Sequence, residues 1–339
     1  MDASRLHPYL GIIASLWRQG RSMPVVEPTG GWEAFARYLE RAKMAGFFHA
    51  KIVKDQVESV FPVGFIQNLQ RFRFHVSAQS SLLEEATAEV CSEIKSSGHK
   101  AVPLKGLWLN RKIYGDASLR RTTDGDIFVS PQAVGPLSEY MRSRGYRVMP
   151  PEHKIVWQTV YKKEGGFPFE AHILLSSPDE NPPPSCEILE RAGAWGEKDE
   201  GLELADALIY LSINNSRDNL VLFPGNIHDI AIIAGKLSAK QWDSVVERSN
   251  RWNWRAGVWL NLTCASDLFG SPAPAGVMKE IKPASWRVRC AWAALRWYRG
   301  TGMEVNNLPK GIGSLYKGSV IEDVSPIAYV LRRRALAAR

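Results

Sequence analysis

The sequence contains no long hydrophobic segment. Apolar residues make up 45% of its 339 positions, but they never form a run of about 18 residues, the length that a membrane-spanning helix requires. The first twenty residues contain a short apolar patch and an early acidic residue, Asp2, without the charged, apolar and small-residue order of a secretory signal. We therefore expect a cytoplasmic protein that does not enter a membrane.

Cysteine is scarce as well. The four cysteines are Cys91, Cys186, Cys264 and Cys290. No two of them have the short spacing of a zinc-binding pair, and their positions do not suggest a disulfide framework. This pattern is typical of a protein in a reducing compartment.

Motifs of several common enzyme and binding classes are missing. The chain has no Walker phosphate-binding motif, no nucleophile elbow and no internal repeat. It also lacks an RNA-binding motif and a stripe of basic and aromatic residues. The net charge of +8 and the pI of 9.3 still favour polyanionic partners such as nucleotides or RNA. Much of the excess charge lies in the C-terminal tail.

Hydrophobic periodicity divides the chain into four regions. Residues 1–80 have helical spacing, with a helix predicted over 60–74 and the next over 81–97. Residues 81–180 alternate between helical patterns and short strands. The strands are predicted at 101–104, 126–129, 146–149, 154–163 and 167–175. After a proline-rich linker, residues 181–300 are helical, and residues 301–339 form a basic tail. The predicted fold is α+β, a mixed sheet with helices, flanked by helical regions at both ends.

The stretch RTTDGDIFVS, residues 121–130, places two carboxylates at the start of a predicted strand. Along an extended strand Asp124 and Asp126 lie on the same face, about 7 Å apart at their Cα atoms. Both can then reach one divalent ion, and oxygen ligands of this kind suit Mg²⁺ or Mn²⁺. The alternative is a simple turn, because Asp-Gly is a common turn dipeptide.

A third acid lies in a later predicted strand. In FPFEAHILL, residues 167–175, Glu170 and His172 lie on the opposite face from their apolar neighbours. If this strand lies beside residues 124–129, three carboxylates converge, as they do in many two-metal sites for phosphoryl and nucleotidyl transfer. Glu170 could instead be a charge on an edge strand. His172 would orient a carboxylate or contact an acceptor, unless it is an ordinary hydrogen-bonded strand histidine.

The sequence PLKGLWL, residues 103–109, supplies candidate phosphate-binding groups. Lys105 and Gly106 stand where a predicted strand leads into a short helix. A glycine at this point lets backbone N–H groups approach phosphate oxygens, and the lysine adds a positive charge. Arg120 and Arg121 follow, just before the acidic pair.

Taken in order, these motifs resemble those of a known family. The segments LKGLWLNRKIYGDASLRRTTDGDIFV, RSRGYRV and FEAHILL are similar to bacterial nucleotidyltransferases of the DNA polymerase beta-like superfamily. Members of that family read LKG, Y, R and DxD, followed by GY and [D/E]xH. The helical segments LADALIYLS and NIHDIAII, which contain Asp206 and Asp229, extend the resemblance over residues 100–265.

The resemblance implies transfer of a nucleoside monophosphate from an NTP such as ATP to an acceptor, with Mg²⁺ or Mn²⁺ as cofactor and pyrophosphate as product. The catalytic and metal-binding residues would be Asp124, Asp126 and Glu170. The nucleotide would be bound by Lys105, Gly106, Arg120 and Arg121. The residues near the acceptor, or supporting the metal ligands, would be His172 and Asp229.

Three functions remain open at this point. The chain could be a nucleotidyltransferase that modifies a small molecule, a peptide or a protein, with the helical regions forming the acceptor pocket. It could be a toxin-like enzyme that modifies tRNA or another RNA, which the basic charge favours and the missing RNA-binding motif disfavours. It could also be an NTP-binding scaffold without activity. The presence of all three acids argues against this third function.

Overall fold

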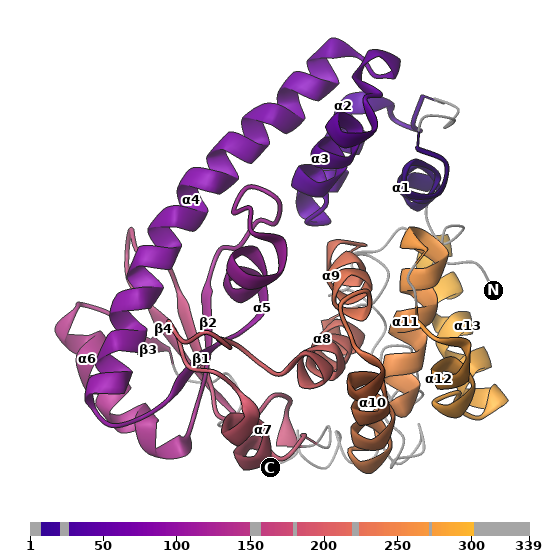
Figure 1. Cartoon of the computed structure of the whole chain (residues 1–339). Helices are drawn as coiled ribbons and strands as arrows, with labels where there is room; N and C mark the ends of the chain where they lie inside the picture. Colours follow the sequence, from indigo (N-terminus) through magenta and orange to yellow (C-terminus); the bar gives the residue numbers. More distant parts are fainter. Residues whose placement is uncertain are drawn as a thin grey trace. The chain divides into compact units, whose positions relative to one another are not determined.

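The computed structural model describes residues 8–20, 27–149, 157–178, 182–218, 224–270 and 273–301. The chain forms two compact units, one of residues 1–69 with 207–339 and the other of residues 70–206 (Figure 1). Except for its first residue, the predicted basic tail lies outside the described residues. Among the described helices, none combines the length and the hydropathy that crossing a membrane requires.

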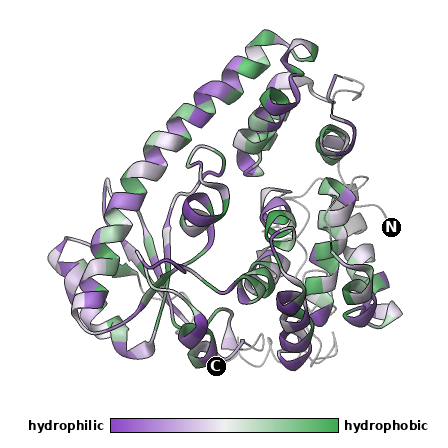
Figure 2. Ribbon diagram, in the orientation of Figure 1, coloured by the Kyte–Doolittle hydropathy of each residue, from purple (hydrophilic) through white to green (hydrophobic). Residues whose placement is uncertain are grey.

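Every regular element that the structure describes in the first unit is a helix. Its elements are α1 (Pro8–Gln19), α2 (Gly31–Arg41), α3 (Ala45–Asp55), η3 (Glu58–Val60), α9 (Pro224–Ala234), α10 (Ala239–Arg251), α11 (Arg255–Phe269), α12 (Ala275–Glu280) and α13 (Ser285–Thr301), with the first turns of α4 (Val63–Ser96) and most of α8 (Leu204–Asp218). Figure 2 shows α10 as mainly hydrophilic. Its buried residues recur at helical spacing, and they are Trp242, Val245, Val246 and Ser249. Burial of one face explains how so polar a segment forms a stable helix in this unit.

His228 of α9 is buried in an aromatic cluster of this unit. Its ring centroid lies 4.3 Å from that of Phe47, 5.4 Å from that of Trp17 and 5.0 Å from that of Phe269. Burial disfavours the charged imidazolium and lowers the pKa of His228 to about 3. The histidine is therefore neutral in the folded protein throughout the neutral and mildly acidic range.

We expect this burial to make the folded state sensitive to acid. Because the folded pKa of His228 lies below the unfolded value of about 6.5, only the unfolded chain gains a proton as the pH falls from that value towards 3. The histidine should therefore reduce the free energy of unfolding by roughly 2 kcal/mol between pH 7 and pH 5. Urea unfolding of the wild type and of His228→Gln at both pH values measures this. Equal pH dependence in the two proteins would contradict the assignment.

The second unit combines a five-stranded sheet with helices. Its elements are α4 from residue 70 onward, β1 (Ala101–Pro103), α5 (Lys105–Trp108), the π-helical η4 (Leu109–Tyr114), β2 (Gly125–Val129), η5 (Pro131–Ala133), α6 (Val134–Ser143), β3 (Arg147–Met149), β4 (Gln158–Lys162), β5 (Phe169–His172), α7 (Ser185–Arg191) and the first residues of α8. The sheet order is β1-β2-β5-β4-β3. Among the described strands, β2 and β5 pair in parallel, and the other neighbours are antiparallel. The mixed sheet and the α+β class are as predicted.

The two faces of the sheet differ in chemistry. Helices α4 and α6 cover one face, and the core there contains apolar residues from both helices and from the strands (Figure 1). The strand residues of this core are Ala101, Ile127, Val129, Tyr161, Phe169 and Ala171. Side chains alternate along a strand, so Asp126, Glu170 and His172 belong to the opposite face. Packing of one face against α4 and α6 thus leaves the polar residues on the other.

The helix boundaries differ from the prediction in one respect. The helices predicted over 60–74 and 81–97 are a single helix, α4, of 34 residues. The intervening segment HVSAQS contains neither glycine nor proline, and its polar residues do not interrupt the backbone hydrogen bonds of a helix. Strand β5 is shorter than predicted at both ends, since it covers Phe169–His172 where the prediction was 167–175.

Candidate functional site

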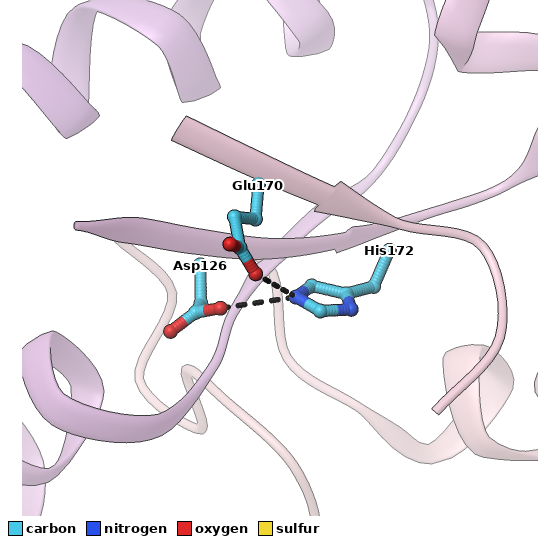
Figure 3. Close-up of side chains that lie close together, drawn as sticks. All are labelled: Asp126, Glu170 and His172. Carbon is cyan, nitrogen blue, oxygen red and sulfur yellow. Dashed lines mark hydrogen bonds and ion pairs between the residues drawn. The ribbon is translucent and has the colours of Figure 1, made fainter. Parts of the chain in front are cut away.

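Three polar side chains meet on the face of β2 and β5 that points away from α4 and α6. The parallel register places Asp126 of β2 opposite Glu170 of β5, and Phe128 opposite His172. Asp126, Glu170 and His172 each offer a ligand-type atom, and these atoms all lie within 4.8 Å of one another (Figure 3). The predicted adjacency of these two strands therefore exists.

His172 lies between the two acids. Its Nε2 atom is 3.0 Å from Oδ1 of Asp126 and 3.5 Å from Oε2 of Glu170 (Figure 3). The side chains of Asp126 and His172 are buried, whereas that of Glu170 is 26% exposed. Glu170 is therefore the member of the cluster that solvent or a substrate can reach most readily.

Lys105 supplies the positive charge that balances this acidic site. Its Nζ atom donates to Oδ1 of Asp126 over 2.8 Å. Burial alone would raise the pKa of Asp126, but the charge of Lys105 and the hydrogen bond from His172 outweigh burial and hold that pKa well below its usual value. Asp126 is consequently a carboxylate anion at neutral pH.

The backbone around Lys105 and Gly106 has an unusual conformation. Lys105 has a φ angle of +49°, in the left-handed region that side chains other than glycine seldom adopt. Strain of this kind costs on the order of 1 kcal/mol and occurs often at functional sites. At Gly106 a Cβ atom would overlap the side chains of Thr122 and Arg120, so only glycine fits between them. The two residues predicted to contact phosphate thus stand beside a buried arginine.

The short helix α5, which begins at Lys105, contacts the loop around Glu200. Trp108 Nε1 donates to the Glu200 carbonyl oxygen over 2.7 Å, and Arg111 donates to the fully buried Glu200 carboxylate. Arg111 also pairs with Glu84. At Gly201, where φ is +100°, a Cβ atom would overlap the Trp108 ring. These contacts hold α5 and η4 in place and so fix the position of Lys105.

Gly125, the residue between the two aspartates, has a packing role. It pairs with Phe169 in the parallel register, and a Cβ atom here would overlap the Phe169 ring. The glycine therefore allows β2 and β5 to pair while the Phe169 ring packs over position 125 in the core. The Phe169 ring therefore explains why glycine, and not an apolar residue with a side chain, stands at position 125.

The other predicted site residues lie in different surroundings. Asp124 is half-buried and precedes β2, and it is not in the group whose ligand atoms lie within 4.8 Å of one another. Since the strand begins at Gly125, strand alternation does not fix the direction of the Asp124 side chain. Arg120 is buried, and the side chain of Arg121 is exposed. Asp229 is buried in α9, which belongs to the helical unit.

Sequence reasoning missed Thr122. Its side chain is 5% exposed and lies against Gly106, and its hydroxyl has no hydrogen-bond partner among the described residues. A threonine in a predicted loop gives no sign of such burial. The Lys105–Asp126 ion pair was missed as well, because the two residues are far apart in the sequence and meet only when β1 pairs with β2.

The donor set fits a divalent metal ion. Two carboxylates and an imidazole lie within 4.8 Å, and carboxylate oxygens are the usual protein ligands of Mg²⁺ and Mn²⁺. No hydrogen bond or ion pair among the described residues involves Oδ2 of Asp126 or Oε1 of Glu170. One oxygen of each acid is thus available to a cation.

Residues 28–270 match the model of a family described as uncharacterised nucleotidyltransferase. The match covers well over half of the chain and includes Lys105, β2 and β5. No curated protein matches the sequence.

Proposed function

Because the chain belongs to this nucleotidyltransferase family, we propose that it moves a nucleoside monophosphate from an NTP to an acceptor hydroxyl, with Mg²⁺ or Mn²⁺ as cofactor. In this reaction the acceptor oxygen bonds to the α-phosphorus, the bond to the bridging oxygen of the β-phosphate breaks, and pyrophosphate leaves. The main support is the pairing of Asp126 with Glu170 across two parallel strands, beside Lys105.

The metal would be held by Asp126 and Glu170, with Asp124 as a third proposed ligand. When bound, a divalent ion neutralises phosphate charge and makes the phosphorus more electrophilic. Asp126 is suited to this role because it remains ionised in a buried position. We propose that residues 81–180 form the catalytic region, and that the helical regions contribute to acceptor recognition in a cytoplasmic enzyme.

The remaining site residues would act on the nucleotide and on the acceptor. Lys105 can donate to the triphosphate from the position it occupies beside Asp126. Gly106 would offer its backbone N–H to a phosphate oxygen. Arg120, whose side chain lies where a Cβ atom of Gly106 would stand, adds positive charge. Glu170, which is more exposed than Asp126, is the candidate base that accepts the proton of the acceptor hydroxyl.

A labelling experiment tests this function and identifies the acceptor class. The protein is incubated with Mg²⁺ or Mn²⁺, each α-³²P-labelled NTP and a cell extract, and the extract is then separated into protein, RNA and small molecules. Asp126→Asn is the inactive variant, and Asp243→Asn, at an exposed position of α10, is the matched control. We expect label on one fraction with the wild type and the control only. If no NTP labels any fraction and none binds the protein, the proposed function is wrong.

A further inference from the structure

The position of the His172 proton follows from the groups around it. Oδ1 of Asp126 accepts a hydrogen bond from the Lys105 ammonium group over 2.8 Å, and the same oxygen lies 3.0 Å from Nε2 of His172. An ammonium group can only donate, and a carboxylate oxygen in such an ion pair can only accept. The proton between Asp126 and His172 is therefore on Nε2, and that nitrogen has no lone pair to offer to a metal.

Within the part of the chain that the structure describes, the other ring nitrogen of His172 lacks the hydrogen-bond partner that metal-binding histidines have. To bind a metal through Nε2, the imidazole would have to carry its proton on Nδ1 instead. Nδ1 is buried and has no hydrogen-bond partner among the described residues. Metal-binding histidines almost always donate their second N–H to a neighbour, and Nδ1 of His172 has no such neighbour among the described residues.

The surroundings of His172 also fix the orientation of its ring. The side chain is 2% exposed, and the Trp157 ring lies 5.6 Å away between centroids. The ring thus presents Nε2 to both acids, with the longer contact of 3.5 Å to Oε2 of Glu170 (Figure 3). Its N–H group lies between two carboxylates that would otherwise repel each other.

We propose that His172 is a positioning residue: its Nε2–H holds the Asp126 and Glu170 carboxylates in one arrangement, and His172 does not itself bind the metal. The proposal rests on the proposed function in that Asp126 and Glu170 are taken as the metal ligands. The contacts with Lys105 and His172 occupy Oδ1 of Asp126 and Oε2 of Glu170, which leaves the second oxygen of each acid for the cation.

The wild-type protein provides the first test, with Mn²⁺ as the probe and without nucleotide. Pulsed electron paramagnetic resonance detects the coupling of Mn²⁺ to the ¹⁴N nucleus of a coordinated imidazole. We expect Mn²⁺ to bind without this coupling. Coupling from a coordinated imidazole that disappears in His172→Gln would overturn the proposal, and so would a failure of Mn²⁺ to bind.

Two variants provide the second test. Glutamine can place an N–H donor near the position of Nε2, whereas leucine cannot. We expect His172→Leu to weaken Mn²⁺ binding about tenfold or more, and His172→Gln to stay within about threefold of the wild type. The matched control is His75→Leu, at an exposed position of α4. Equal losses in the glutamine and leucine variants would contradict a donor role. If the leucine variant does not fold, the wild-type spectrum and the glutamine variant decide.

These outcomes separate the inference from the proposed function. Mn²⁺ bound without imidazole nitrogen, together with a functional glutamine variant, supports the positioning role even if no NTP is transferred. If the enzyme transfers label and its Mn²⁺ is coordinated by an imidazole, the proposed function is supported and the positioning role of His172 is refuted.

Discussion

Replacement of Asp126 by asparagine is expected to abolish nucleotidyl transfer while leaving the fold intact. Asparagine has nearly the same shape, and its side-chain oxygen can still accept hydrogen bonds from Lys105 and His172. The variant removes the negative charge, however, and with it the main anionic ligand for a divalent cation. Because the lost interaction acts on the charged transition state, we expect kcat/KM to fall by at least about 10³-fold.

The measurement has two parts. Steady-state transfer with the labelled NTP gives kcat/KM, and calorimetric titration with Mn²⁺ gives the metal affinity. Asp243→Asn removes the same charge at an exposed position and should behave as the wild type. An Asp126→Asn enzyme within tenfold of wild-type activity would exclude Asp126 from the catalytic machinery.

Replacement of Lys105 by methionine is expected to destabilise the protein in a way that a divalent metal reverses. The variant leaves the buried Asp126 carboxylate without the ammonium group that lies 2.8 Å away. Removing one partner of a buried ion pair costs about 3 kcal/mol or more, because the other charge remains buried. A divalent cation at the same carboxylate restores the balance, so saturating Mn²⁺ should stabilise this variant more than it stabilises the wild type.

Urea unfolding with EDTA and with Mn²⁺ measures the effect of Lys105→Met. Lys95→Met, at an exposed position near the end of α4, is the matched control and should lose little stability. The double variant Lys105→Met/Asp126→Asn should recover much of the loss, since no uncompensated carboxylate remains. The assignment of Lys105 as the counter-ion of Asp126 fails if Mn²⁺ stabilises the variant and the wild type equally.

Residues in the strands were predictable from local geometry. Side chains alternate along any strand, so the placement of Glu170 and His172 on one face, with Phe169 and Ala171 in the core, follows from their order alone. The same rule did not settle Asp124, because β2 begins one residue later. The prediction was reliable within the strand and incomplete at its end, where the backbone no longer dictates the direction of a side chain.

The residues around the strands depended on contacts that sequence order does not contain. Lys105 contacts Asp126 because β1 and β2 pair in an antiparallel register. Thr122 is buried because Gly106 has no side chain to keep it away. Neither contact has a local signal, since the residues of each pair are separated by an intervening helix or loop.

The sequence by itself determined the α+β class and the central strands, because periodicity and side-chain alternation are local properties of a chain. Its ordered motifs indicated nucleotidyl transfer through their resemblance to a known family. Only the tertiary structure decided which acids meet, which cation balances them and where the His172 ring lies between them. These depend on strand pairing and burial, which bring together groups that are distant in the chain and set the charge that each can hold.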